Sequence, residues 1–180
     1  LEYEANRFVG YKVPYYRGPK GELVSVGNTR AEENAWNASL LHLALTMMPE
    51  HPARYAWAYK NAELKLSSYA QPSDLDSAEV LHGRPLKDWL GGSNAYDDGI
   101  VINHGIVHPD YMAAIEHHLE GAIVSSLARK PTPRAALYNT DATYKALIDL
   151  TFTESSSYPD TSVSARAPGG TMYKNGSGDL

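Results

Sequence analysis

The segment between Gly99 and Met112 carries the side chains best suited to acid–base chemistry. Asn103, His104, His108 and Tyr111 lie within about nine residues, where an apolar extended run meets the predicted start of a helix. Free backbone amides and the positive end of the dipole at a helix N-terminus favour a neutral imidazole or an anionic phenol. A tyrosine there could remove a proton next to a carboxylate and return it to a leaving oxygen. Alternatively, the histidines bond loop backbone and the tyrosine packs on the core.

A second group of polar side chains lies in the first long predicted helix. Asn34 and Asn37 are three residues apart and are expected to share a face, and Glu33 and Asn37 form an i,i+4 pair. Asparagine is a poor helix former, so two of them in an apolar helix call for a reason. They either aim their amides into a cleft or bond to loops that cross the helix.

Two other chemistries receive less support. His104 and His108 have the spacing of zinc ligands on a helix, but Pro109 places both before the helix, so we expect no metal and no cofactor. Asp97 and Asp98 could act with a glutamate of the first helix as the carboxyl pair of a glycoside hydrolase. Turn chemistry explains an Asp-Asp-Gly sequence equally well. The chain has no Gly-x-Ser-x-Gly elbow and no phosphate-binding glycine loop.

Four helices are expected to position these residues. A capping box at Thr29–Glu32 begins the first helix, which runs to about Met48. The others are expected over Ala53–Tyr69, from Pro109 to about Leu127, and over Asp141–Phe152. The expected inward stripes are Trp36, Leu40, Leu43 and Met47 in the first; Trp57, Leu64 and Leu66 in the second; Met112, Ile115, Leu119, Ala122 and Ser126 in the third; and Tyr144, Leu147, Ile148 and Thr151 in the fourth.

Composition narrows the class of partner. The net charge of -5 and the lack of a basic cluster argue against nucleic-acid binding. No run approaches the roughly 18 apolar residues of a membrane helix. There are no cysteines, so disulfide and thiolate chemistry are excluded. Because the chain starts at Leu1 without Met, we expect a mature form or a fragment of a longer protein.

Taken together, the asparagines of the first helix, the Asn103-His104-Gly105 loop with His108, and Tyr111 at a helix start resemble the polysaccharide lyases built on an alpha/alpha toroid, such as the chondroitin and hyaluronate lyases. The resemblance implies that Asn34 or Asn37 binds a uronate carboxylate, that His104 or His108 assists, and that Tyr111 moves the proton. The family's arginine has three candidates here: Arg30, Arg54 and Arg84.

The sequence thus predicts a mainly α protein of antiparallel helix pairs, as in part of such a toroid, with long loops and little strand. We expect one helical domain over 1–180, with mostly loop at 1–28 and 153–180. The expected function is eliminative cleavage of an acidic polysaccharide by a secreted or extracytoplasmic protein. The alternatives are a glycoside hydrolase and a non-catalytic carbohydrate-binding or structural module. Besides an oligosaccharide or polysaccharide, the remainder of its own chain is an expected partner. The expected substrate-binding residues are Trp36, Asn103, Arg30 and Glu33.

Overall fold

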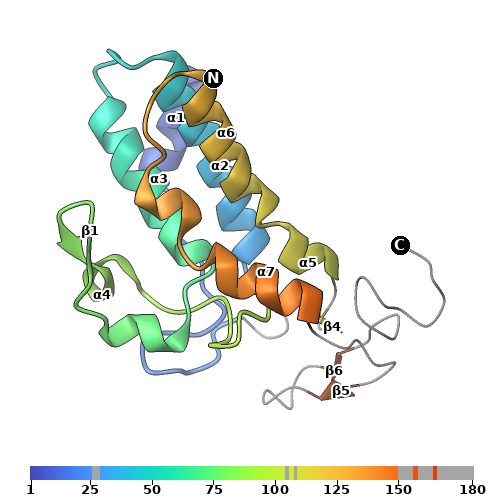
Figure 1. Ribbon diagram of the computed structural model, residues 1–180. Coiled ribbons are helices and arrows are strands. Elements are labelled where there is room, and N and C mark those ends of the chain that lie inside the picture. Colours follow the sequence, from blue (N-terminus) through green and yellow to red (C-terminus); the bar gives the residue numbers. More distant parts are fainter. Residues whose placement is uncertain (26–28, 104–105, 108, 150–155, 158–163, 166–180) are drawn as a thin grey trace.

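The protein is mainly helical, with long helices side by side and a loop-rich region at one end of them (Figure 1). The computed structural model describes residues 1–25, 29–103, 106–107, 109–149, 156–157 and 164–165. Within these ranges, the side chains of 103–110 and those beyond 149 lie outside the described part.

The helices and strands have the following bounds. The α-helices are α1 Glu2–Val9, α2 Ala31–Met47, α3 Arg54–Ser68, α4 Leu86–Trp89, α5 Pro109–Ala113, α6 Glu116–Leu127 and α7 Thr140–Asp149. Two 3-10 turns are η1 Pro72–Asp76 and η2 Arg134–Leu137. Three antiparallel strand pairs are β1 Val80–Leu81 with β2 Arg84–Pro85, β3 Ile102–Asn103 with β4 Ile106–Val107, and β5 Ser156–Ser157 with β6 Ser164–Ala165.

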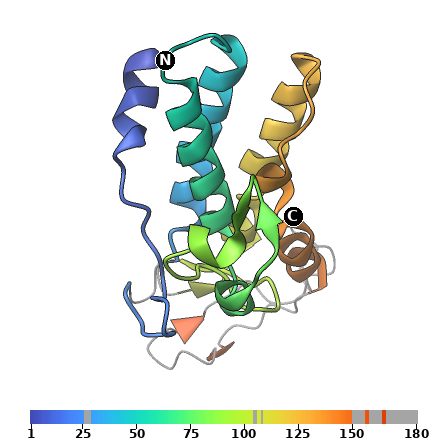
Figure 2. The ribbon, with the colours of Figure 1, turned by 90° about the vertical axis from the view of Figure 1, so that its left-hand side faces the viewer.

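Helices α2 and α3 form an antiparallel hairpin at the centre of the molecule, seen from the side in Figure 2. The two prolines between them, Pro49 and Pro52, separate the helices as expected because proline cannot continue a helix interior. The predicted inward residues of α3 are confirmed: Trp57, Leu64 and Leu66 are fully buried. Trp57 and Leu64 belong to one buried cluster and Leu66 to another, because α3 is buried on more than one side.

The predicted inward stripe of α2 is wrong. Trp36 is 61% exposed and Met47 65% exposed, and Leu43 is also at the surface. The buried residues of α2 are mostly small: Ala31, Asn34, Ala35, Ala38, Leu41, His42 and Ala44. Because α2 contacts α1, α3 and α6 together, its buried positions are mostly alanines, with Leu41 and His42 as the larger buried side chains.

The capping box predicted at Thr29 is also absent. Helix α2 begins at Ala31, and its N-cap Arg30 has φ 64, in the left-handed region, with no side-chain cap hydrogen bond. Thr29 is buried, and its backbone N–H donates to the carbonyl of Ile102 at 2.9 Å. The backbone N–H of Thr29, from which the Glu32 side chain would accept a hydrogen bond in a capping box, is thus engaged by a tertiary contact with β3 instead.

The single helix expected over 109–127 is two helices, α5 and α6, with Ala114 and Ile115 between them. Met112 and Ile115 are buried as predicted, but Leu119 is 44% exposed. Past the interruption, the buried residues of α6 are His118, Gly121 and Ser125. The interruption changes the helical phase, so a stripe counted from Met112 does not continue along α6.

The two ends of the chain differ from expectation in different ways. Residues Glu2–Val9, expected as loop, form α1, whose Asn6 side chain accepts a hydrogen bond from the indole of Trp57 at 2.9 Å. Helix α7 buries Leu147 as predicted but leaves Tyr144 50% exposed. Thr151, Phe152 and most of the loop expected over 153–180 lie outside the described residues. In the described part, no helix combines the length and apolar character needed to cross a bilayer.

Candidate functional site

The two segments that carried the predicted chemistry lie next to each other. Besides the Thr29 to Ile102 hydrogen bond, Ala31 at the start of α2 and Met112 of α5 belong to one buried cluster. Tyr111 is partly buried and packs against that cluster. His104 and His108 lie outside the described residues, as does the side chain of Asn103. The structure thus brings Ile102 and Met112, from the two described ends of this segment, to the start of α2.

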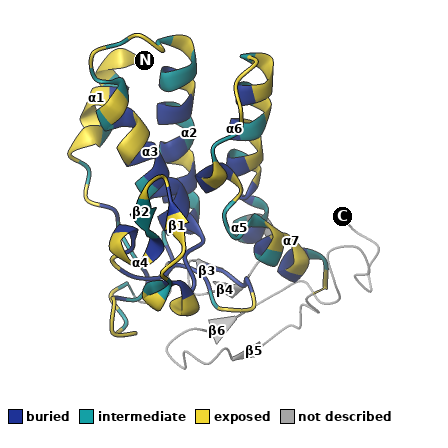
Figure 3. Ribbon diagram, turned by 60° about the vertical axis from the view of Figure 1, so that its left-hand side comes forward, coloured by how far each residue is buried: buried dark blue, intermediate teal, exposed yellow. Residues whose placement is uncertain are grey.

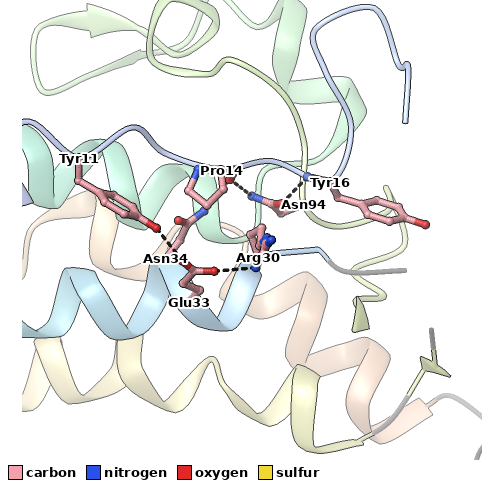
Figure 4. Close-up of polar contacts among 7 residues, drawn as sticks. All are labelled: Tyr11, Pro14, Tyr16, Arg30, Glu33, Asn34 and Asn94. Atoms are coloured by element: carbon pink, nitrogen blue, oxygen red, sulfur yellow. Dashed lines mark hydrogen bonds and ion pairs between the residues drawn. The ribbon is translucent and has the colours of Figure 1, made fainter. Parts of the chain in front are cut away.

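The two asparagines of α2 do not meet in one cleft. Asn34 is fully buried, and its amide donates to the carbonyl of Pro14 at 3.1 Å (Figure 4). Asn94 donates to the same carbonyl at 3.3 Å and accepts from the backbone N–H of Tyr16 at 2.8 Å. Asn34 therefore holds a loop that crosses the helix, which is one of the two roles that the sequence left open.

Asn37 lies on another side of α2, in a groove between α2 and α6. The groove has a volume of about 610 Å³ and includes Trp36, whose ring stacks on His117 at 5.3 Å. Leu40 and Ile123 contribute to its mostly apolar lining. Figure 3 shows exposed residues along the outer side of α6. The predicted site residues Trp36 and Asn37 thus lie apart from Arg30, Glu33 and Asn34.

Arg30, Glu33 and Tyr11 form a polar chain at the start of α2. The guanidinium of Arg30 lies 3.0 Å from one carboxylate oxygen of Glu33, and the hydroxyl of Tyr11 donates to the other at 2.6 Å. Burial, together with the hydrogen bond and charge of Glu33, raises the pKa of Tyr11 to about 12. Tyr11 therefore stays protonated at neutral pH and, with Glu33, orients Arg30.

Arg30 lines a pocket of about 430 Å³ at the loop-rich end of the molecule. We call it the Arg30 pocket and define it by five of its lining residues: Lys12, Tyr15, Glu22, Arg30 and Gly91. Lys12 and Arg30 supply two positive charges, while the carboxylate of Glu22 accepts a hydrogen bond from the backbone N–H of Lys20 at 3.0 Å. Glu22 keeps its negative charge in this hydrogen bond, so the charged side chains of the lining sum to one net positive charge, which favours an anion placed beside Lys12 and Arg30.

The ring of Tyr15 forms an aromatic wall of the Arg30 pocket. Its hydroxyl pairs with the Ser67 hydroxyl at 2.8 Å and accepts from the backbone N–H of Gly91 at 3.0 Å. Burial raises the pKa of Tyr15, and these two hydrogen bonds oppose the rise. A Cβ at Gly92 would lie 2.9 Å from this ring, so glycine allows the close contact. The Tyr15 ring is therefore held in place in the pocket wall, and its hydroxyl is already hydrogen-bonded.

Sequence reasoning found Arg30 and Glu33 but missed Lys12, Tyr15 and Glu22. The available signal was the tyrosine-rich segment over 11–16, which was expected to be loop. The carboxylates considered for glycoside hydrolysis are engaged locally: Asp97 accepts from the backbone N–H of Ser73 and Asp98 from that of Ile100. In the described ranges, no group of three or more potential ligands is arranged to hold a metal ion.

A separate group of basic side chains is buried where α2, α3 and α6 meet. We call His42, Lys65 and His118 the buried basic cluster; each is less than 5% exposed. His42 pairs with the Ser125 hydroxyl at 2.9 Å, and His118 with the Lys65 carbonyl at 3.0 Å. The ammonium of Lys65 has no hydrogen-bond partner among the described residues.

Burial dominates the pKa values in this cluster. It lowers the pKa of Lys65 to about 8, with partial opposition from the charge of Glu120. Burial and the charge of Lys65 lower the pKa of His42 to about 4 and that of His118 to about 3. Both imidazoles are therefore neutral at pH 7. Because these pKa values change on folding, we expect the cluster to make the stability of the fold depend on pH.

Comparison of the chain with protein-family models, with curated proteins and with solved structures found no match in any of the three. Support for a function therefore comes from the geometry of the Arg30 pocket and its surroundings.

Proposed function

We propose that this protein binds an acidic polysaccharide in the Arg30 pocket and cleaves it by elimination. The observation that carries the proposal is the convergence of Arg30, Lys12 and the ring of Tyr15 on one pocket of about 430 Å³. A guanidinium and an ammonium suit the carboxylate of a uronate, and an aromatic face suits the apolar face of a sugar ring. The molecule's negative net charge makes such local recognition necessary.

In this proposal Arg30 takes the carboxylate-binding role that the resemblance gave to Asn34 or Asn37. The Asn34 amide already donates to Pro14, whereas Arg30 lines the pocket and is oriented by Glu33. Neutralising the carboxylate increases the acidity of the adjacent C–H bond. No metal is required for that effect when a guanidinium supplies the charge.

Tyr111 is the proposed proton carrier, with His104 or His108 as its supporting group. Its support is the contact of its segment with the start of α2, through Thr29 and the shared buried cluster. Tyr111 would take the proton next to the carboxylate as a C=C bond forms and the C–O bond to the neighbouring sugar breaks. The proton would then pass to the leaving oxygen.

The antiparallel helix pairs are consistent with part of an alpha/alpha toroid, which we propose as the larger architecture. A polymeric substrate of this type fits a secreted or extracytoplasmic location, which is part of the same proposal.

Elimination is tested by incubating the protein with uronate polysaccharides and following the ultraviolet absorbance of the new conjugated double bond. We expect the absorbance to rise with the wild type and not with Tyr111→Phe, while the circular dichroism of the two proteins stays the same. Full activity of Tyr111→Phe would remove this residue from the mechanism. No rise on any uronate substrate would remove elimination altogether.

Binding is tested separately by affinity electrophoresis in gels containing a uronate polymer. Arg30→Gln should weaken retention about tenfold, as expected for the loss of one charge-assisted contact. Residue 30 has a left-handed backbone conformation, which strains glutamine and arginine equally. The comparison therefore reports the effect of the side chain on binding. Arg7→Gln, on the exposed side of α1, is the matched control and should bind like the wild type.

Two other outcomes would redirect the proposal. Release of reducing ends without the absorbance signal would favour a glycoside hydrolase. Retention without any product would favour a carbohydrate-binding module. The module has an observation in its favour: the Tyr15 hydroxyl in the pocket lining and the Glu33 carboxylate bonded to Arg30 are both engaged in hydrogen bonds.

A further inference from the structure

Helix α3 presents a row of aromatic side chains to solvent. Tyr55 is 73% exposed and Tyr59 is 47% exposed. They are four residues apart, so they lie on the same side of the helix, one turn from each other. Tyr59 packs on Trp89 at the end of α4, with 4.7 Å between the ring centroids. Trp89 is only 6% exposed, so the exposed rings are those of Tyr55 and Tyr59, and Trp89 supports Tyr59 from the core side.

Each exposed ring in this row also carries an arginine. The Arg54 guanidinium lies 4.4 Å from the centroid of the Tyr55 ring. The Arg84 guanidinium lies 5.8 Å from the Tyr59 ring and 5.2 Å from the Trp89 ring, and it donates a hydrogen bond to the Tyr59 hydroxyl. We call Arg54, Tyr55, Tyr59 and Arg84 the α3 strip, with Trp89 as the buried ring on which Tyr59 packs. Stacking fixes the guanidinium planes and leaves N–H groups for an anionic partner.

The α3 strip leads toward the Arg30 pocket. Trp89 precedes by two residues Gly91, which lines that pocket. On α3 itself, the residue after Tyr59 is Lys60, whose ammonium donates to the carbonyl of Tyr11 at 2.7 Å. Tyr11 in turn precedes Lys12 of the pocket. Short stretches of chain thus link Tyr59 and the Trp89 behind it to residues that line the pocket.

We propose that the α3 strip is a second binding surface for the same acidic polysaccharide, engaged by sugar units beyond those in the Arg30 pocket. The rings present flat apolar faces, and the two arginines present positive charge. This combination matches a uronate chain and does not match a neutral or cationic polymer. The inference rests on the proposed function for the nature of its ligand.

Two linked surfaces predict a dependence on ligand length. A chain that reaches both the pocket and the strip gains from a high effective concentration at the second surface, and an oligosaccharide that fills only the pocket does not. The α3 strip should therefore matter for long chains alone.

The test compares the wild type with Tyr55→Ala and with Tyr55→Ala/Tyr59→Ala, using polygalacturonate and its disaccharide as probes in isothermal titration calorimetry. We expect the double variant to lose about tenfold in affinity for the polymer and to bind the disaccharide unchanged. Tyr55→Ala alone should show a smaller loss and, because its ring is mostly exposed, should fold normally. Tyr144→Ala, 50% exposed on α7, is the matched control and should match the wild type.

Unchanged polymer affinity in the folded double variant would overturn the proposal. So would an equal loss with Tyr144→Ala, or binding of a neutral glucan by the wild type as tight as its binding of polygalacturonate. The pocket is judged independently through Arg30→Gln and the disaccharide. If that variant binds the disaccharide normally, the Arg30 pocket assignment fails, whereas the polymer affinity of the double variant still decides the α3 strip.

Discussion

At the scale of single residues, the buried basic cluster is the clearest departure from what a core normally contains. His42 and His118 are each bonded through one ring nitrogen, while the Lys65 ammonium has no hydrogen-bond partner among the described residues. Desolvation favours the neutral form of all three groups. We therefore expect the two imidazoles to affect the stability of the fold at acidic pH and the lysine to affect it at alkaline pH.

Acid should destabilise the fold through the two histidines. Their pKa values fall from 6.5 to about 4 and about 3 on folding, so the unfolded chain binds more protons below pH 6.5. The stability from their neutral forms is complete above pH 6.5 and is lost as the pH falls toward those values. By a pH of about 4.5 the loss should be about 2 kcal/mol for each histidine. Urea unfolding at several pH values measures it.

His118→Gln should remove about half of this acid dependence and leave the part due to His42, because glutamine keeps a donor for the Lys65 carbonyl and does not titrate. A slope that survives His118→Gln unchanged would contradict the assignment.

At the scale of elements, the turn before β3 depends on a glycine. Gly99 has φ +84, and a Cβ there would lie 2.3 Å from the backbone oxygen of Ala142 in α7. Its N–H also donates to the Tyr96 carbonyl, which closes the turn. Gly99 thus allows α7 to pack directly on the segment that leads to Tyr111.

Gly99→Ala should destabilise the protein by about 3 kcal/mol, from left-handed strain and the clash with α7 together. Gly83→Ala separates the two effects, because Gly83 has φ +77 and a Cβ added there would meet no atom within 4 Å. Strain alone should cost about 1 kcal/mol there. Thermal unfolding of both variants provides the comparison, and equal losses would show that α7 does not constrain Gly99.

At the scale of the whole molecule, stability should increase from neutral toward mildly alkaline pH. Below pH 8, Lys65 is charged in both the folded and unfolded chains, and the folded protein bears the full cost of burying it. Between about 8 and 10.5 the unfolded chain binds the extra proton, so the free energy of unfolding rises with pH. Above pH 10 the raised pKa of buried Tyr69 acts in the opposite direction, because only the unfolded chain ionises.

Lys65→Met should therefore raise the free energy of unfolding at pH 7 by about 2 kcal/mol, since methionine fills a similar volume without a charge. The gain should shrink as the pH rises from 8 to 10.5. Lys60→Met on the same helix is the contrast: it loses the hydrogen bond to Tyr11 and the ion pair with Glu63, and should destabilise. A Lys65→Met protein less stable than the wild type at pH 7 would contradict the prediction.

The helical class and the main helix hairpin follow from the sequence alone. Helical spacing with Pro49 and Pro52 located α2 and α3, and the spacing of apolar residues in α3 identified Trp57 as a core residue. These features are local, because proline and helical period act within a few residues. Helix α1 was missed because eight residues are too few to be stable alone, and its packing on α2 and α3 comes from distant chain.

Only the tertiary structure decided which face of α2 is buried and which residues meet at its start. An apolar pattern around most of a helix says that several faces can be buried, but neighbouring elements select them. The same holds for the site: Arg30 and Glu33 were found from the sequence, whereas Lys12 and Tyr15 join them because Asn34 and Asn94 hold the crossing loop at Pro14. Hydrogen bonds between segments far apart in the chain leave no periodic trace in the sequence, so the folded structure alone reveals them.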